Sequence, residues 1–152
     1  MSDDSERVWD LMERFPLCTL VTWDNDRLRS RPMTAFVRRR NEAIYFLADV
    51  RFFEEGAIRA HPEISLTFAD SANGQIACLS GKAQVSSDRV AIRELWATSA
   101  RDFWESPDDP NIRMLRIAPQ QAQFRDGTLQ KVVQMCVPSV APVRKSGDRA
   151  AI

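Results

Sequence analysis

A chain of 152 residues, 44% hydrophobic and 28% charged, has the composition of one ordinary globular domain with a substantial core. Its 21 basic and 21 acidic residues balance, which argues against a nucleic-acid-binding protein, because such proteins usually carry a basic excess. No apolar run approaches the roughly 20 residues that span a bilayer, and the acidic start lacks the features of a signal peptide, so we expect a cytoplasmic domain without membrane contact.

The first part of the chain predicts a helix, three strands and a second helix. Apolar residues recur at helical spacing from Val8 to Phe15, and Pro16 ends that helix. Pro32 removes a ladder donor from the second strand and implies an edge or a break there. The expected elements are a helix over 5–15, strands over 17–23, 28–37 and 43–48, and a helix over 53–60.

The second part predicts further hairpins and a helix. Asn73-Gly74 is a strong hairpin signal, and Gly81 fits a bulge or a close backbone approach. Ser87 or Asp88 can cap a helix, and Pro119 separates two short strands. The expected elements are strands over 64–69 and 75–85, a helix over about 89–96, strands over 113–117 and 121–125, and a C-terminal helix and tail within 127–152. About six short strands with flanking helices predict a small closed barrel over residues 5–126.

Few residues suit catalysis or metal binding. His61 is the only histidine, and Cys18, Cys78 and Cys136 lie far apart, so we expect no metal site and name no catalytic residue. With five glycines, the chain has no glycine-rich phosphate loop. Side chains would therefore have to hold any phosphate.

Several motifs along the chain are specific through their order and spacing, although no single one is. They are Ser30-Arg31-Pro32-Met33, Ile44-Tyr45-Phe46-Leu47, the run from His61 to Asp70, Ser80-Gly81-Lys82-Ala83, Glu94-Leu95-Trp96, Pro107-Asp108-Asp109-Pro110 and Met114-Leu115-Arg116-Ile117. In these motifs the chain resembles the pyridoxamine 5'-phosphate oxidase-like split barrels, and within them the bacterial general stress protein 26 branch.

The resemblance implies a six-stranded antiparallel split β-barrel that forms a homodimer and binds FMN in two equivalent clefts at the subunit interface. Residues 31–34 would line the edge of the isoalloxazine ring, and residues 48–54 would surround the phosphate. The second subunit would contribute the region near Gln75. The candidate cofactor-binding residues are Arg31, Pro32, Met33, Thr34, Ala48, Arg51, Gln75 and Arg125.

The chain departs from the family pattern at the phosphate segment. Ala48 stands where the family usually has Thr or Ser, and Glu54 where it has Lys; Arg125 follows Phe124 where Trp is usual. Arg51 or Arg125 could compensate for the lost Lys. Two functions therefore stay open: an FMN-dependent oxidoreductase or flavin carrier, and a non-catalytic dimer that has lost FMN and binds another planar or anionic ligand. Under the second, Glu54→Lys should restore FMN binding.

Overall fold

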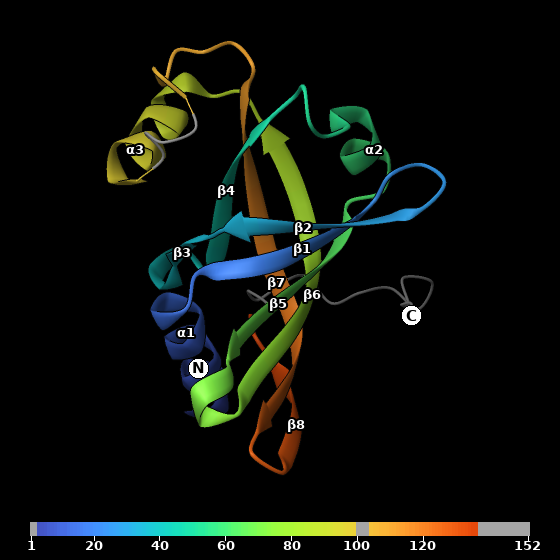
Figure 1. The fold of residues 1–152 in the computed structure, drawn as a ribbon, viewed down its shortest axis with the longest axis vertical. Helices are drawn as coiled ribbons and strands as arrows, with labels where there is room; N and C mark the ends of the chain where they lie inside the picture. Colours follow the sequence, from blue (N-terminus) through green and yellow to red (C-terminus); the bar gives the residue numbers. More distant parts are fainter. Residues whose placement is uncertain (1–2, 100–103, 137–152) are drawn as a thin grey trace, which may run out of the picture.

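The computed structural model describes residues 3–99 and 104–136. Its helices are α1 (Asp3–Arg14), α2 (Glu55–Ala60) and α3 (Arg89–Ser99), with short 3₁₀ turns at Arg39–Asn41 and Ser71–Asn73. Its strands are β1 (Leu17–Trp23), β2 (Leu28–Thr34), β3 (Phe36–Arg38), β4 (Ala43–Asp49), β5 (Glu63–Asp70), β6 (Gln75–Ser86), β7 (Ile112–Asp126) and β8 (Leu129–Gln134) (Figure 1). None of these helices is long and apolar enough to cross a membrane.

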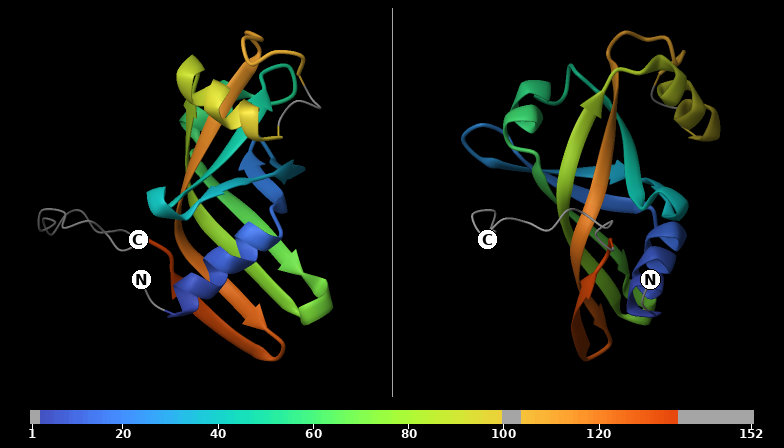
Figure 2. Two further views of the ribbon diagram at one scale, coloured as in Figure 1. Left: turned by 90° about the vertical axis from the view of Figure 1, so that its left-hand side faces the viewer. Right: turned by 180° about the vertical axis from the view of Figure 1, so that it is seen from behind.

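The antiparallel sheet curls because its two end strands belong to one stretch of chain. The strand order is β2-β1-β5-β6-β7-β4-β3, and β8 pairs with β7. Although β2 and β3 stand at opposite ends of this order, only Ala35 separates them in the sequence. The chain must therefore bring the two ends of the sheet together, as both views of Figure 2 show. The expected split barrel is confirmed, and residues 3–99 and 104–136 contribute eight strands to it in place of six.

Pro32 predicts an edge or a break in the second strand, and the position of β2 at the edge of the sheet agrees with the first of these. Pro32 pairs with Thr19 of β1, and β2 is an edge strand, so the missing N–H leaves no ladder partner unsatisfied. The strand runs unbroken to Thr34 and stops at Ala35, whose N–H donates instead to the Pro16 carbonyl at 2.8 Å. The predicted strand over 28–37 is thus two strands, β2 and β3.

The two short strands predicted on either side of Pro119 are one strand, β7, and that part of the prediction is wrong. Pro119 lies opposite Gly81, at the point where the β6–β7 register shifts. A β-bulge disrupts the ladder locally, so a residue without an N–H is tolerated there. The extra residue of the bulge is Gln120 of β7, and Gly81 provides the close backbone approach opposite it. A Cβ on Gly81 would lie 2.6 Å from the carbonyl oxygen of Ala118.

The helix predicted from Leu129 is a strand, β8, so this prediction is also wrong. Gly127 has a φ of 64°, which allows a tight turn, and β8 folds back to pair with β7 from Gln121 to Asp126. Val133 and Met135 are buried as a result. The remainder of the predicted tail, residues 137–152, lies outside the described residues.

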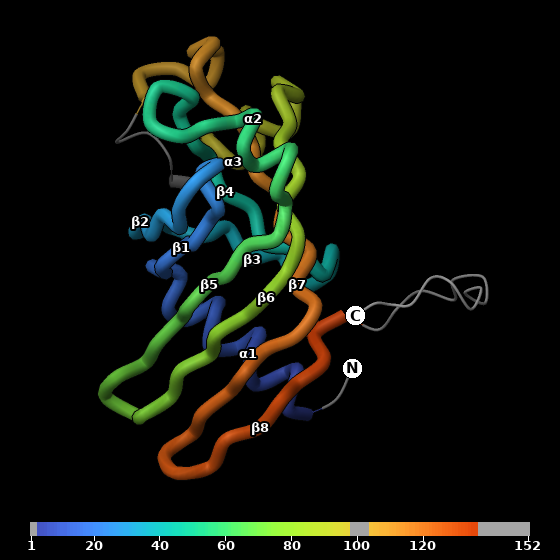
Figure 3. The backbone as a smooth tube through the Cα atoms, turned by 90° about the vertical axis from the view of Figure 1, so that its right-hand side faces the viewer, coloured from blue at the N-terminus to red at the C-terminus, as the bar shows by residue number. Residues whose placement is uncertain are grey.

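One face of the sheet is covered by α1, and no helix among the described residues covers the other. Val8, Trp9, Leu11 and Met12 of α1 are fully buried against the sheet, in one cluster with Leu66 and Phe68 of β5, among others. The left view of Figure 2 shows α1 lying across this face. Figure 3 shows the opposite side, where strands β5 to β8 have no described helix in front of them. A second, smaller cluster lies beneath α3.

Candidate functional site

Arg31 is a half-buried cation on β2. Side chains alternate along the strand, so Arg31 and Met33 point inward, whereas Pro32 and Thr34 are exposed. Nη1 of Arg31 donates to Oγ1 of the buried Thr22 at 2.8 Å. Burial lowers the pKa of Arg31, and the positive charge of Arg29 lowers it further.

Among the described residues, none forms an ion pair with Arg31. Asp24, whose negative charge raises the pKa of Arg31, forms its ion pair with Arg29 at 3.5 Å. Removing a guanidinium from water without a carboxylate partner is costly, so such a group is well suited to meet an electronegative ligand.

At the end of β4, the protein places a carboxylate where four donors meet. Asp49 is 8% exposed. Its Oδ1 accepts hydrogen bonds from the backbone N–H and the Nε of Arg51, both at 2.9 Å. Its Oδ2 accepts from Nη2 of Arg51 at 2.6 Å and from Nε1 of Trp104 at 3.1 Å. The Arg51 guanidinium holds the pKa of Asp49 far below its usual range, against the opposing effect of burial.

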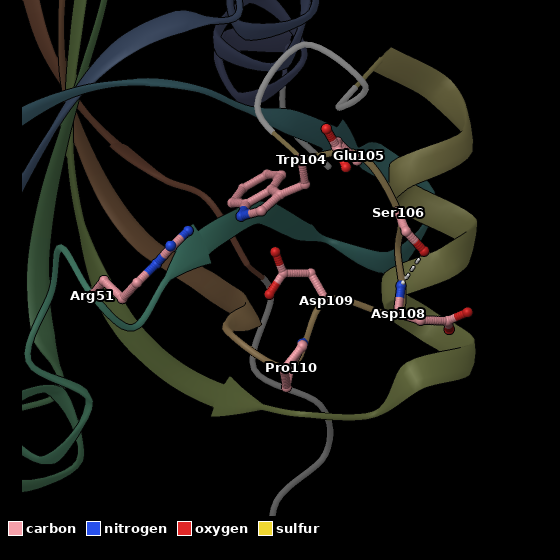
Figure 4. A pocket seen from close by; sticks show the side chains of 7 residues that line it. All are labelled: Arg51, Trp104, Glu105, Ser106, Asp108, Asp109 and Pro110. Carbon is pink, nitrogen blue, oxygen red and sulfur yellow. Dashed lines mark hydrogen bonds between the residues drawn. The ribbon is translucent and has the colours of Figure 1, made fainter.

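A cavity of about 540 Å³ opens beside this pair (Figure 4). Its wall consists of Arg51 and the loop before β7: Trp104, Glu105, Ser106, Asp108, Asp109 and Pro110. Asp108 is held by Arg93 of α3 at 2.8 Å, and Oδ1 of Asp109 accepts from the N–H of Asn111 at 2.9 Å. The cavity wall therefore carries more negative than positive charge.

The three residues between Arg51 and α2 lie in different environments. Phe52 is 72% exposed, and the Arg51 guanidinium lies 5.7 Å from its ring centroid. Phe53 packs on the main core, as does Met33. Glu54 is exposed and precedes α2 without capping it through its side chain. The helix predicted over 53–60 begins at Glu55, which bonds to Arg59 and Arg113.

Within a single subunit, the predicted site residues do not all lie close together. Ala48 pairs with Arg113 at one end of β7, whereas Gln75 pairs with Asp126 at its other end. At about 3.3 Å per residue, these positions are separated by roughly 40 Å of strand. Arg125 lies beside Gln75, where its Nε donates to the Gly127 carbonyl at 2.9 Å. Arg31 to Thr34 lie on a different strand and do not line the cavity.

Asp49 is a site residue that the sequence did not reveal. The signal that could have identified it is local, because Asp side chains often accept from the N–H two residues later, and Arg51 is at that position. The contribution of Trp104 had no such signal, since it is 55 residues away in the sequence.

Comparison with solved structures supports the fold. General stress protein 26 from Bacillus anthracis str. Sterne is 18% identical, with a TM-score of 0.73 over 88% of this chain and 99% of that one. A protein related to general stress protein 26 from Clostridium acetobutylicum is 14% identical, with a TM-score of 0.77 over 89% and 97%. A heme binding protein from Mycobacterium smegmatis is 13% identical, with a TM-score of 0.70 over 89% of this chain and 59% of that one.

Sequence comparison gives the family. No curated protein sequence matches this chain. The family model described as pyridoxamine 5'-phosphate oxidase like matches residues 3–146, which is most of the chain. Because this match covers most of the chain, the chain belongs to the pyridoxamine 5'-phosphate oxidase-like family.

Proposed function

We propose that this protein is a small flavin-binding protein in which Arg31 contacts the flavin ring. The observation that carries this proposal is the half-buried Arg31 guanidinium, which pairs with no described carboxylate. A planar guanidinium donates several hydrogen bonds in one plane, a geometry that suits the oxygen and nitrogen atoms along the edge of a planar ring. FMN is the family's expected ligand and stays a prediction for this chain.

The residues present fit the ring of FMN better than its phosphate. Within the segment expected to surround the phosphate, Ala48 is buried and has no hydroxyl, and Glu54 carries a negative charge. Arg51, the cation of that segment, is already paired with Asp49. Binding of the isoalloxazine ring is therefore the part of the family function that we propose with physical support.

We further propose that the protein acts as a homodimer through the uncovered face of its sheet. Two complete rows of side chains cross this face without a charge, although charged residues make up 28% of the chain. In strand register these rows are Pro32, Thr19, Thr67, Cys78, Gln123 and Val132, and Ser30, Val21, Ser65, Ser80, Gln121 and Gln134. Depletion of charge is typical of the centre of an interface. A second chain would also offer its Gln75 region to a shared site.

The chemistry of such a flavoprotein would come from its cofactor, because the protein supplies orientation and access in enzymes of this kind. An oxidoreductase and a flavin carrier both fit this proposal. The alternative is a non-catalytic dimer that binds another planar ligand, and the occupied Arg51 favours it. A cytoplasmic location stays a prediction.

Titration of the purified, flavin-stripped protein with FMN and with riboflavin tests the proposal, with flavin fluorescence as the readout. Loss of a hydrogen bond to a charged group costs about 1.5–3 kcal/mol, so Arg31→Ala should weaken flavin binding by about tenfold or more. Arg29→Ala is the matched control, because it removes the same charge from the same strand but from a guanidinium already paired with Asp24. The proposal would be overturned if the protein bound neither FMN nor riboflavin.

The dimer has a separate test in sedimentation velocity. Thr67→Glu places a charge in the middle of the uncharged face and should produce monomers, because an unpaired charge is costly to bury in an interface. Val90→Glu, on an exposed residue of α3, should leave the dimer intact. A monomeric wild type, or a Thr67→Glu variant that remains dimeric, would refute this interface.

A further inference from the structure

We propose that Asp49 permanently fills an anion-binding site beside Arg51 and so makes the protein select ligands without a phosphate. This inference rests on the proposed function, which it deepens by naming the ligand class. It concerns the residues of the cavity wall beside Arg51 rather than the ring contact at Arg31.

The donors around Asp49 form a set suited to an oxyanion. Arg51 supplies its backbone N–H together with Nε and Nη2, one edge of its guanidinium, and Trp104 adds an indole N–H. Arginine forks bind carboxylates and phosphates with the same two-point geometry. The protein's own carboxylate therefore makes the contacts that a ligand's phosphate would need.

Displacing Asp49 would be unfavourable. Its side chain is more than nine-tenths buried, so a phosphate that took its donors would leave a buried carboxylate without partners. The incoming group would also approach Glu105, Asp108 and Asp109, which line the same cavity. A phosphate ester carries a charge of about −1.5 to −2 at neutral pH, which these carboxylates repel. A neutral group such as a sugar hydroxyl meets neither obstacle.

The test compares the affinities of riboflavin and FMN, which differ by one phosphate. We expect the wild type to bind riboflavin at least as tightly as FMN. Asp49→Asn keeps the side-chain shape, removes the charge and should shift the FMN-to-riboflavin preference by tenfold or more toward FMN. Asp108→Asn is the matched control: it removes a charge from the same cavity, but one paired with Arg93, and should shift the preference little.

A double variant assigns the effect to the anion site. Adding Arg51→Met to Asp49→Asn should abolish the gain for FMN, because the fork that would hold the phosphate is gone. If Asp49→Asn does not fold, Trp104→Phe removes one donor to Asp49 and should shift the preference in the same direction, though less. The inference is overturned if the wild type prefers FMN by tenfold, or if the folded Asp49→Asn protein leaves the preference unchanged.

Inorganic phosphate gives a readout that does not depend on flavin. The ³¹P line width of phosphate should be unaffected by the wild type and broadened by Asp49→Asn. If no variant binds either flavin but Asp49→Asn binds phosphate, the proposed function fails while the inference about Asp49 stands. If Asp49→Asn binds riboflavin but neither prefers FMN nor binds phosphate, the inference about Asp49 fails and flavin binding stands.

Discussion

Gly81→Ala should destabilise the protein, because the two longest strands approach each other too closely for a Cβ at this position. The added carbon would lie 2.6 Å from the carbonyl oxygen of Ala118 and 3.2 Å from Cα of Pro119. Ordinary contacts begin near 3.4 Å, so the strands must separate by several tenths of an ångström. The atoms in the way are backbone on β7, which cannot move aside as a side chain would.

The magnitude follows from two opposing effects. Forcing an extra carbon into a packed site typically costs about 1–3 kcal/mol, whereas Gly→Ala at a compatible site stabilises by about 0.4–1 kcal/mol through the unfolded chain. The close contact is the larger effect, so we expect a net loss of about 1–2 kcal/mol. For a chain of this size, this loss lowers Tm by about 2–8 °C.

Urea denaturation followed by circular dichroism measures this loss. Gly56→Ala is the matched control, since Gly56 lies inside α2 and a Cβ added there would meet no atom within 4 Å beyond its chain neighbours and the backbone of its own helix. That substitution should raise the free energy of unfolding by about 0.5–1 kcal/mol. If Gly81→Ala is as stable as the wild type, the bulge is not held by the close approach of backbones.

Three further predictions concern single side chains. Arg51 lowers the pKa of Asp49, so the stability that ionised Asp49 contributes is complete above about pH 4 and is lost as the pH falls. In acid titrations between about pH 5 and 2, the free energy of unfolding of Asp49→Asn should therefore fall less steeply than that of the wild type. Burial raises the pKa of Cys18 to about 12, so a thiol reagent at pH 8 should modify the exposed Cys78 faster than Cys18. If the face that carries Cys78 is the dimer interface, a higher protein concentration should slow the modification of Cys78. Asp88→Ala removes a side chain that accepts from the N–H of Val90 at 3.0 Å, and should cost about 0.5–2 kcal/mol in thermal unfolding.

The elements that were predictable from the sequence depend on neighbours in the chain. Asn73-Gly74 gives the β5–β6 turn, where Gly74 has a φ of 65°. Asp88, one of two cap candidates, begins α3. Gly81 marks the bulge, although the Ala118 carbonyl that requires a glycine there is distant in the sequence. In each case the residue type limits the local backbone strongly enough to be recognised without the partner.

The elements that were not predictable depend on a distant partner. Leu129, Val132 and Val133 fit a helical spacing as well as a strand, and pairing with β7 decides between the two. Pro119 predicts a strand end, yet the bulge at the neighbouring Gln120 allows β7 to continue. At the site, the motif around Arg31 gives a cofactor contact that stays a prediction, whereas the ion pair between Arg51 and Asp49 required the structure.

Under the inference about Asp49, this residue opposes a phosphate beside Arg51 more strongly than Glu54 does. Glu54 is exposed, so water screens its charge and its repulsion of a phosphate is weak. Asp49 is buried and engages the guanidinium that a phosphate would need. Glu54→Lys alone should therefore improve FMN affinity only a few-fold, since the new cation lies in water and Arg51 stays occupied. Asp49→Asn should give the larger gain, and the double variant should exceed both. A Glu54→Lys variant that by itself gains a hundredfold in FMN titrations would reverse this order and show that Glu54 opposes the phosphate more strongly.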